Sequence, residues 1–320
     1  MIISKLPFKE SVRTSVLSKQ WRYLFRETTS LVFKESEFMT QPVFNRKTVE
    51  PTRVDTLLFV RVMRECVSRF TGKVIENFEL HLSQPIGFEE DIMSLTKFAA
   101  SRQVKNLVLD FSNPTQENIS LALQARRDRA SRCIYPRKNE LDVSHLFFNF
   151  LYVRDLTVCS FLLQMLKDCD DPMALHDPLK TRHLVMKTNL HTNDFMGMSI
   201  FLKSCPELES LTFDILTTRL ARAPSPLVID PAKYWITSNA YECLEKTLKV
   251  VKVKNFRGRS NELHVLQYLI RTGRVMERLD LYEAKGLNHK QKSSVLASVE
   301  EVQQNFKRAS RNLQITLHNA

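Results

Sequence analysis

The chain has 320 residues, and its 47 Lys and Arg outnumber its 35 Asp and Glu, which gives a formal net charge of +12. The hydrophobic fraction of 43%, with 20 Phe, is sufficient for a folded core and excludes a chain that is disordered throughout. No stretch approaches the roughly 18 consecutive apolar residues of a membrane helix, so no membrane association is expected.

Cysteine spacing and the N-terminal residues bear on the cellular compartment. The six cysteines are Cys66, Cys133, Cys159, Cys169, Cys205 and Cys243. None of them forms a Cys-x-x-Cys pair, which predicts reduced, mostly buried thiols. Residues 1–10 contain Lys5, Pro7 and Lys9 but no long apolar run, so no signal peptide is expected. The sequence therefore predicts an intracellular protein of the cytoplasm, the nucleus or both.

The first stretch with a clear pattern runs from Leu6 to Leu31 and is helical in period. Its apolar residues recur three to five positions apart, at Val12, Val16, Leu17, Trp21, Leu24 and Phe25. This spacing favours helices over a strand. Such a short unit cannot bury a core alone, so it needs a partner surface or the following domain.

The next residues predict a linker and then two helices. Phe33–Glu50 is mixed and polar, as a linker would be. An amphipathic helix is expected over Arg53–Phe70, with Val54, Leu57, Leu58, Val62, Cys66, Val67 and Phe70 on its apolar face. A second helix is expected to open at Glu89–Asp91 and to end near Arg102, a charge order that suits the helix dipole.

A gapped apolar triplet recurs along the rest of the chain. Six copies are clear, and a weaker seventh combines Thr181 with Leu184 and Met186. The last two positions of each copy alternate as in a half-buried strand. The six clear copies are Ile75/Phe78/Leu80, Val104/Leu107/Leu109, Val153/Leu156/Val158, Leu208/Leu211/Phe213, Leu248/Val251/Val253 and Met276/Leu279/Leu281.

The spacing of these copies predicts the fold. Four of the six intervals between first positions are 27 to 29 residues, near the upper end of the leucine-rich repeat period. The two longer intervals contain irregular stretches around Arg126–Lys138 and Arg219–Tyr234, which we interpret as insertions. We therefore expect an α/β solenoid of strand–helix repeats with its parallel sheet on the concave side. An ordinary α/β domain with evenly spaced strands is the alternative.

The N-terminal stretch resembles an F-box, in the form found in plants. The matching residues are Ile3-Ser4, Leu6-Pro7, Ser15-Val16-Leu17-Ser18-Lys19, Gln20-Trp21-Arg22 and Leu24-Phe25. The resemblance implies docking on the Skp-type adaptor of a Skp–cullin–F-box (SCF) ubiquitin ligase. It also implies the adaptor-binding residues, which are Ile3, Leu6, Pro7, Val16, Leu17, Trp21 and Leu24. The opening helix of the family would precede Ile2, so we expect a truncated F-box that lacks part of this surface.

The body and the C-terminus resemble the other parts of plant F-box/FBD/leucine-rich repeat proteins. Ser204–Leu211 is similar to their Cys-Pro join between helix and strand, and the chain from Ala240 onward is similar to the FBD domain. Gly258 is expected to adopt a backbone conformation that a Cβ would hinder. The expected domains are a partial helical F-box over 1–40, leucine-rich repeats over 41–239 and an FBD-like domain over 240–320. The FBD-like domain would complete the solenoid.

The sequence lacks the motifs of common catalytic and metal sites. It has only six Gly, no Walker-type loop, no Gly-x-Ser-x-Gly and no His-Glu-x-x-His, so we expect no enzyme activity, cofactor or metal. Cys205 and Cys243 are expected to be packed thiols. The acidic run at 168–171 precedes Pro172, which predicts a turn. Solvated sheet-edge charges are the favoured interpretation of Lys249, Lys252 and Lys254, ahead of partner binding.

The favoured function is a substrate receptor that binds the adaptor, and through it a cullin, and holds an unknown target protein on the repeats. It would act by proximity and would perform no bond chemistry. One alternative is a basic nucleic-acid-binding repeat protein, suggested by the net charge and the Arg126–Lys138 cluster. Tyr135 is the only aromatic residue in this cluster, which counts against binding by base stacking. The other is a truncated relative that keeps the fold but no longer binds the adaptor.

Overall fold

A computed structural model describes residues 28–38, 53–83, 85, 87–111, 151–166, 178–216, 230–237 and 240–319. The chain divides into two compact units. We call them the N-terminal unit (Met1–Val153 with Leu220–Ala223) and the C-terminal unit (Arg154–Arg219 and Pro224–Ala320). The two units are described separately below.

The described part of the N-terminal unit holds a parallel sheet in the order β1-β2-β3. The apolar residues of the strands lie in register, so that Leu31 is opposite Phe78 and Phe78 is opposite Leu107. All three are at most 1% exposed. The elements are β1 (Ser30–Lys34), α2 (Glu35–Phe38), α3 (Arg53–Ser68), β2 (Asn77–His81), α4 (Glu89–Ala100) and β3 (Asn106–Asp110).

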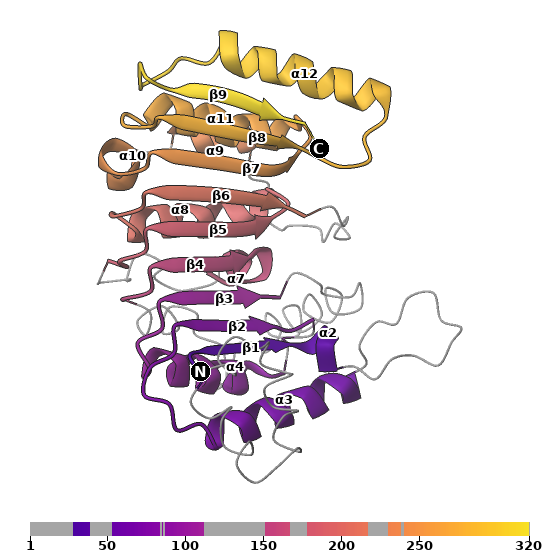
Figure 1. The fold of residues 1–320 in the computed structure, drawn as a ribbon. Coiled ribbons are helices and arrows are strands. Elements are labelled where there is room, and N and C mark those ends of the chain that lie inside the picture. The colour runs from indigo at the N-terminus through magenta and orange to yellow at the C-terminus, as the bar shows by residue number, and fades with distance from the viewer. Residues whose placement is uncertain are drawn as a thin grey trace, which may run out of the picture. The chain divides into compact units, whose positions relative to one another are not determined.

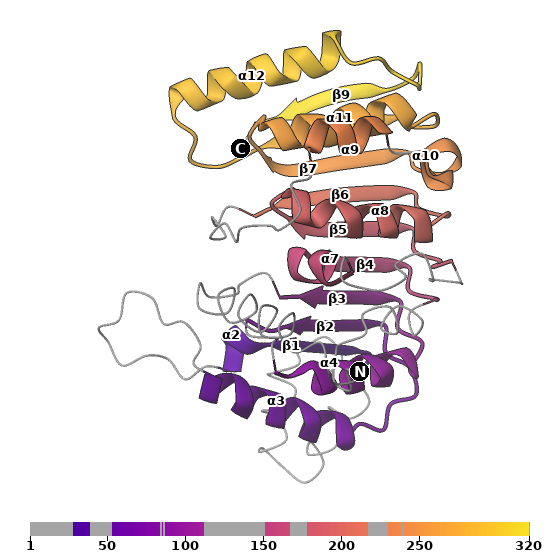
Figure 2. The ribbon, with the colours of Figure 1, turned by 180° about the vertical axis from the view of Figure 1, so that it is seen from behind.

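The C-terminal unit holds a second run of parallel strands, in the order β4-β5-β6-β7-β8-β9. The strands are β4 (Asp155–Cys159), β5 (His183–Thr188), β6 (Ser210–Ile215), β7 (Val250–Phe256), β8 (Arg278–Glu283) and β9 (Gln314–His318). The helices are α7 (Ser160–Leu166), η3 (Thr192–Asp194), α8 (Phe195–Ser204), α9 (Pro231–Thr237), α10 (Glu242–Lys246), α11 (Ser260–Thr272) and α12 (His289–Gln304). Figures 1 and 2 show α8, α9 and α11 on one face of this sheet. No helix of the described residues covers its other face, which we call the open face.

All seven triplet copies of the sequence form strands, β2 to β8 in order. Their apolar positions point into the core, and Ile75, Phe78 and Leu80 are each 0% exposed. The weak copy is as well buried as the others, because Thr181 is 0% and Leu184 is 1% exposed. The predicted α/β class with a parallel sheet is therefore confirmed.

Two strands of the structure were not predicted. The segment over Ser30–Lys34 was expected to end a helix and begin a linker, but it forms β1. It is a strand because Leu31 and Phe33 alternate inward and because it pairs with β2 along its whole length. The other is β9, which pairs with β8 and carries the apolar residues Ile315 and Leu317.

Helix α3 forms where it was predicted, but its buried face differs from the expected one. Phe59, Val60 and Met63 are at most 2% exposed, whereas Leu57 and Leu58 are 59% and 56% exposed. The helix has apolar residues on both sides, so periodicity alone could not select the side that packs. The assignment of Leu57, Leu58 and Val62 to the core was wrong.

The stretch interpreted as an insertion around Arg219–Tyr234 ends in a helix that belongs to the core. Trp235 of α9 is 2% exposed, and its ring lies 4.9 Å from that of Tyr268 and 5.1 Å from that of Phe195. Arg271 donates from Nη2 to the carbonyl oxygen of Trp235 at 2.9 Å, which fixes the end of this helix. The aromatic cluster joins α9 to α8 and α11.

A buried carboxylate organises the turn that follows β5. Asp194 is 0% exposed and accepts hydrogen bonds from Thr188 Oγ1 at 2.6 Å, Gln164 Nε2 at 2.7 Å and Ser160 Oγ at 2.9 Å. Burial raises the pKa of Asp194, and these three donors oppose that shift. The three bonds join β5, α7 and the start of α8.

Gly258 confirms the backbone conformation expected for it. Its φ is +66°, and a Cβ at this position would lie 2.4 Å from Ser298 Oγ. Beside it, the backbone N–H of Arg257 donates to Glu262 Oε2 at 2.9 Å, and Glu262 is 2% exposed. Burial raises the pKa of this carboxyl group. The turn between β7 and α11 is therefore held by a left-handed glycine and a buried acid.

Candidate partner-binding face

The open face of the C-terminal sheet carries the side chains that alternate with the core residues. Because the strands are parallel and in register, these side chains form rows that run across the sheet. One row is Asp155, His183, Ser210, Val250, Arg278 and Gln314. The next is Thr157, Val185, Thr212, Lys252, Asp280 and Thr316. The open face is thus polar, and its composition varies from strand to strand.

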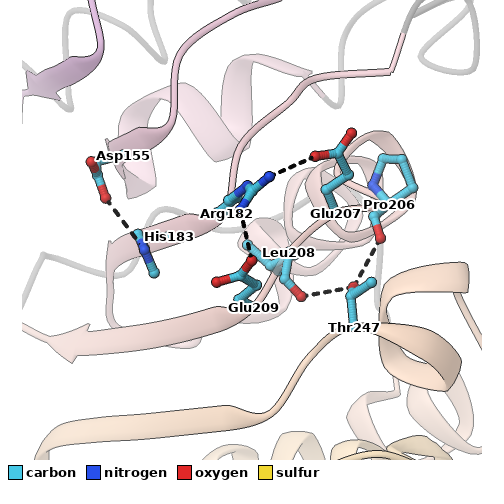
Figure 3. Close-up of polar contacts among 8 residues, drawn as sticks. All are labelled: Asp155, Arg182, His183, Pro206, Glu207, Leu208, Glu209 and Thr247. Carbon is cyan, nitrogen blue, oxygen red and sulfur yellow. Dashed lines mark hydrogen bonds and ion pairs between the residues drawn. The ribbon is translucent and has the colours of Figure 1, made fainter.

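Exposed ion pairs lie where the strands β4 to β6 begin (Figure 3). Arg182 places Nη1 3.2 Å from Glu209 Oε1 and Nη2 3.7 Å from Glu207 Oε2, and His183 Nε2 lies 3.9 Å from Asp155 Oδ1. The Arg182 side chain is 45% exposed, and its two acidic partners are similarly exposed. Solvent screens such pairs, so they contribute little to stability.

One hydroxyl group, that of Thr247, bonds to the join between α8 and β6. Thr247 Oγ1 lies 2.8 Å from the carbonyl oxygen of Pro206 and 2.9 Å from that of Leu208, so its single proton is shared between them (Figure 3). Cys205 and Leu208 at this join are both 0% exposed. The Cys-Pro-Glu-Leu segment therefore aligns β6 with β7.

A buried carboxylate lies on the open face at β8. The Asp280 side chain is 6% exposed, with Oδ2 2.9 Å from Arg278 Nε and Oδ1 3.4 Å from His318 Nε2. The His318 ring stacks on Tyr282 with 4.5 Å between centroids and 15° between planes. Arg278, Tyr282 and His318 thus cover Asp280, and the Arg278 guanidinium compensates its charge.

Strand β7 carries two lysines, Lys252 and Lys254, that were expected to lie at a sheet edge. That assignment was wrong, because β7 pairs with β6 on one side and β8 on the other. Lys252 is half-buried and Lys254 is exposed, and neither makes an ion pair within the described part of the chain. Lys249 lies just before the strand and differs, since its Nζ is 3.3 Å from Glu277 Oε1.

Strands β1 to β3 of the N-terminal unit carry a connected charge network. Lys34 Nζ lies 3.6 Å from Glu79 Oε2, which is 3.1 Å from His81 Nε2, and His81 Nδ1 lies 3.3 Å from Asp110 Oδ2. Burial alone would lower the pKa of His81, but its two carboxylate partners outweigh burial and raise it. The hydrogen bond from His81 lowers the pKa of Glu79.

Cys205 and Cys243 are packed thiols, as expected from the sequence, whereas Cys133 and Cys169 lie outside the described residues. Cys205 and Cys243 are both 0% exposed. Burial raises the pKa of the Cys243 thiol to about 12 and moves that of Cys205 in the same direction. A thiol with a raised pKa is a poor nucleophile at neutral pH. Among the described residues, no group of three His, Cys, Asp or Glu is placed to hold a metal ion.

Several predicted features lie outside the described residues. They are the adaptor-binding set Ile3, Leu6, Pro7, Val16, Leu17, Trp21 and Leu24, the basic Arg126–Lys138 cluster, and the acidic run at 168–171. No helix among the described residues is long and apolar enough to cross a membrane.

Comparison with known proteins finds matches both to the N-terminal segment and to the C-terminal part of the chain. A family model of the F-box domain matches residues 1–32, and one of the FBD domain matches residues 237–281. A protein of Arabidopsis thaliana named F-box/LRR-repeat protein is 31% identical, covering 91% of this chain and 90% of the relative. The chain belongs to the F-box/LRR-repeat family. The FBD match covers α10, β7 and α11 and ends in β8, so Lys252 and Lys254 lie within it.

Other relatives in this family agree. A second A. thaliana F-box/LRR-repeat protein is 30% identical and covers 98% of this chain and 94% of the relative. An A. thaliana F-box protein is 29% identical, with 99% of this chain and 96% of the relative covered. The predicted resemblance to plant F-box, FBD and leucine-rich repeat proteins is therefore confirmed.

Proposed function

We propose that this F-box/LRR-repeat protein is a substrate-receptor subunit of an SCF ubiquitin ligase. The observation that carries the proposal is the F-box match over residues 1–32, which ends within β1, the first of the parallel strands. Docking on the Skp-type adaptor, and through it on a cullin, would use Ile3, Leu6, Pro7, Val16, Leu17, Trp21 and Leu24. The chain would work within the cell, in the cytoplasm, the nucleus or both.

The repeats would form a leucine-rich repeat solenoid that holds the target protein on its open, concave face. The rows of polar side chains on β4 to β9 support this, because a sheet with one face covered by helices offers the other for contact. Catalysis would be by proximity only, since the receptor raises the local concentration of the target near the ubiquitin-carrying enzyme.

Copurification tests adaptor binding. The full chain is coexpressed with a tagged Skp-type adaptor, and we expect it to be retained on the affinity resin. Leu17→Asp places a charge in the proposed contact and should abolish retention, whereas Lys290→Glu on α12 should not. An adaptor that fails to retain the wild-type chain, while it retains another F-box relative, would contradict the proposal.

A further inference from the structure

Two lysines on the open face of the C-terminal unit, Lys252 and Lys254 of β7, have no ion pair among the described residues. The neighbouring carboxylates have partners: Asp280 is held by Arg278 and His318, and Asp214 Oδ1 accepts from Asn255 Nδ2 at 3.3 Å. Lys252 and Lys254 lie on the same face without an ion pair in the part of the chain that the structure describes. A partner that approaches β7 therefore meets two ammonium groups that have no ion pair among the described residues, with the Asp214 carboxylate opposite Lys254 in the register.

The spacing of these groups matches an extended peptide. Lys252 and Lys254 are alternate residues of one strand, so their Cα atoms are about 6.6 Å apart. Alternate side chains of an extended ligand repeat at the same distance. Val250 is the preceding residue on this face of β7, and it is only half-buried. Along β7 the open face thus offers one apolar contact followed by two cations.

We propose that β7 binds an extended acidic segment of the target protein, with carboxylates at alternate positions on Lys252 and Lys254 and an apolar residue on Val250. The proposal rests on the proposed function, since it names the chemistry of the target that the open face presents. The free cations are lysines, which act as point charges, while Arg278 is already paired with Asp280. Two separate point charges at alternate positions suit one carboxylate each, whereas the bidentate fork of Arg278, on the neighbouring strand β8, is not free.

Peptide binding tests this assignment with the full chain. A fluorescein-labelled peptide with Leu and two Glu at alternate positions is titrated and followed by anisotropy, beside a peptide of equal composition whose two Glu are adjacent. We expect tighter binding of the alternating peptide and a decline with added salt. Lys252→Glu/Lys254→Glu should weaken it about tenfold.

A matched double variant distinguishes binding at β7 from a nonspecific effect of the net positive charge. Lys290→Glu/Lys307→Glu changes the net charge equally, but Lys290 lies on α12 and Lys307 follows that helix. We expect it to change peptide affinity less than about twofold. Equal losses in the two double variants, or none in either, would overturn the proposal.

A single-stranded oligonucleotide serves as a further probe. The proposal is overturned if the oligonucleotide binds more tightly than the peptide and Lys252→Glu/Lys254→Glu abolishes that binding, because the open face then binds nucleic acid. Adaptor copurification is measured on the same variants and should be unchanged. Peptide binding without adaptor binding would defeat the proposed function alone, and adaptor binding without peptide binding would defeat only this inference.

Discussion

Arg278 and Asp280 form an ion pair within one strand, with Arg278 Nε 2.9 Å from Asp280 Oδ2. The carboxylate is nearly buried, so removing its charge should lower the free energy of unfolding more than removing that of an exposed acid. We expect Asp280→Asn to lower the free energy of unfolding by about 1 to 2 kcal/mol, measured by urea denaturation. Asp155→Asn is the matched control, because its carboxylate is 43% exposed and 3.9 Å from His183 Nε2. Similar losses in both variants would contradict the buried role of Asp280.

Asp214 lies opposite Lys254 in the register of β6 and β7. Its charge would repel an acidic ligand, although the carboxylate accepts a hydrogen bond from Asn255. Asp214→Asn keeps an acceptor oxygen for that bond and removes the charge. We expect this variant to bind the alternating peptide about twofold more tightly, in the same anisotropy titration. Weaker binding would show that Asp214 contributes to the face instead of opposing the ligand.

The His81 network of the N-terminal unit predicts a pH dependence. The pKa of His81 is raised above 6.5, so its charged form stabilises the fold fully below pH 6.5 and the contribution is lost as the pH rises through the folded pKa. The pKa of Glu79 is lowered below 4.5, so its contribution is present above pH 4.5 and is lost as the pH falls through the folded pKa. Both contributions are complete between pH 4.5 and 6.5.

Thermal unfolding of His81→Gln checks this window. The substitution should cost about 0.5 to 1 kcal/mol at a pH of about 5.5 and much less at a pH of about 9, where the wild-type imidazole is neutral. A cost that stays constant with pH would exclude an ionic role for His81. Lys105→Gln, which removes an exposed pair with Glu76, is the control for general charge effects.

Gly258 and Gly286 allow backbone strain to be separated from steric conflict. Both have positive φ, +66° and +72°, but a Cβ at Gly286 would meet nothing within 4 Å, whereas one at Gly258 would meet Ser298. Gly286→Ala should therefore cost about 1 kcal/mol, from the left-handed backbone alone. Gly258→Ala should lower the free energy of unfolding by more than Gly286→Ala does, up to a total of about 3 kcal/mol.

A double variant completes the Gly258 test. Adding Ser298→Ala to Gly258→Ala removes the nearer of two conflicting atoms and should recover part of the loss, while Ser298 Cβ, 2.7 Å from the added Cβ, remains. Free energies of unfolding from urea titration measure each value. Equal costs at the two glycines, with no recovery in the double variant, would contradict the close approach of Ser298.

The internal strands could be predicted because their apolar triplets repeat, and burial on one face imposes that pattern on each copy. Terminal strands lack this constraint. Ile315 and Leu317 of β9 have a neighbouring strand on one side only, and they are half-buried. Strand β1 was not predicted because the helical pattern of the N-terminal stretch extends to Leu31 and overlaps it. Pairing with β2 overrides that local preference, and pairing cannot be read from a single segment.

The candidate site was less predictable than the fold. Residue types identify Lys252 and Lys254, but only the register shows that β7 is an internal strand and that Arg278 is engaged by Asp280. A sequence pattern gives the face on which a side chain lies without giving the charges that its neighbours neutralise. For α3, two apolar sides made even the face ambiguous, and Leu57 proved to be exposed.

The dissociation constant between the purified full chain and a Skp-type adaptor tests the receptor role most directly. Isothermal titration should give saturable binding with one adaptor per chain, abolished by Leu17→Asp and unchanged by Lys252→Glu/Lys254→Glu. Far-ultraviolet circular dichroism of each variant shows that its fold is intact. No measurable heat with the wild-type chain, under conditions in which another F-box protein binds the same adaptor, would contradict the receptor role.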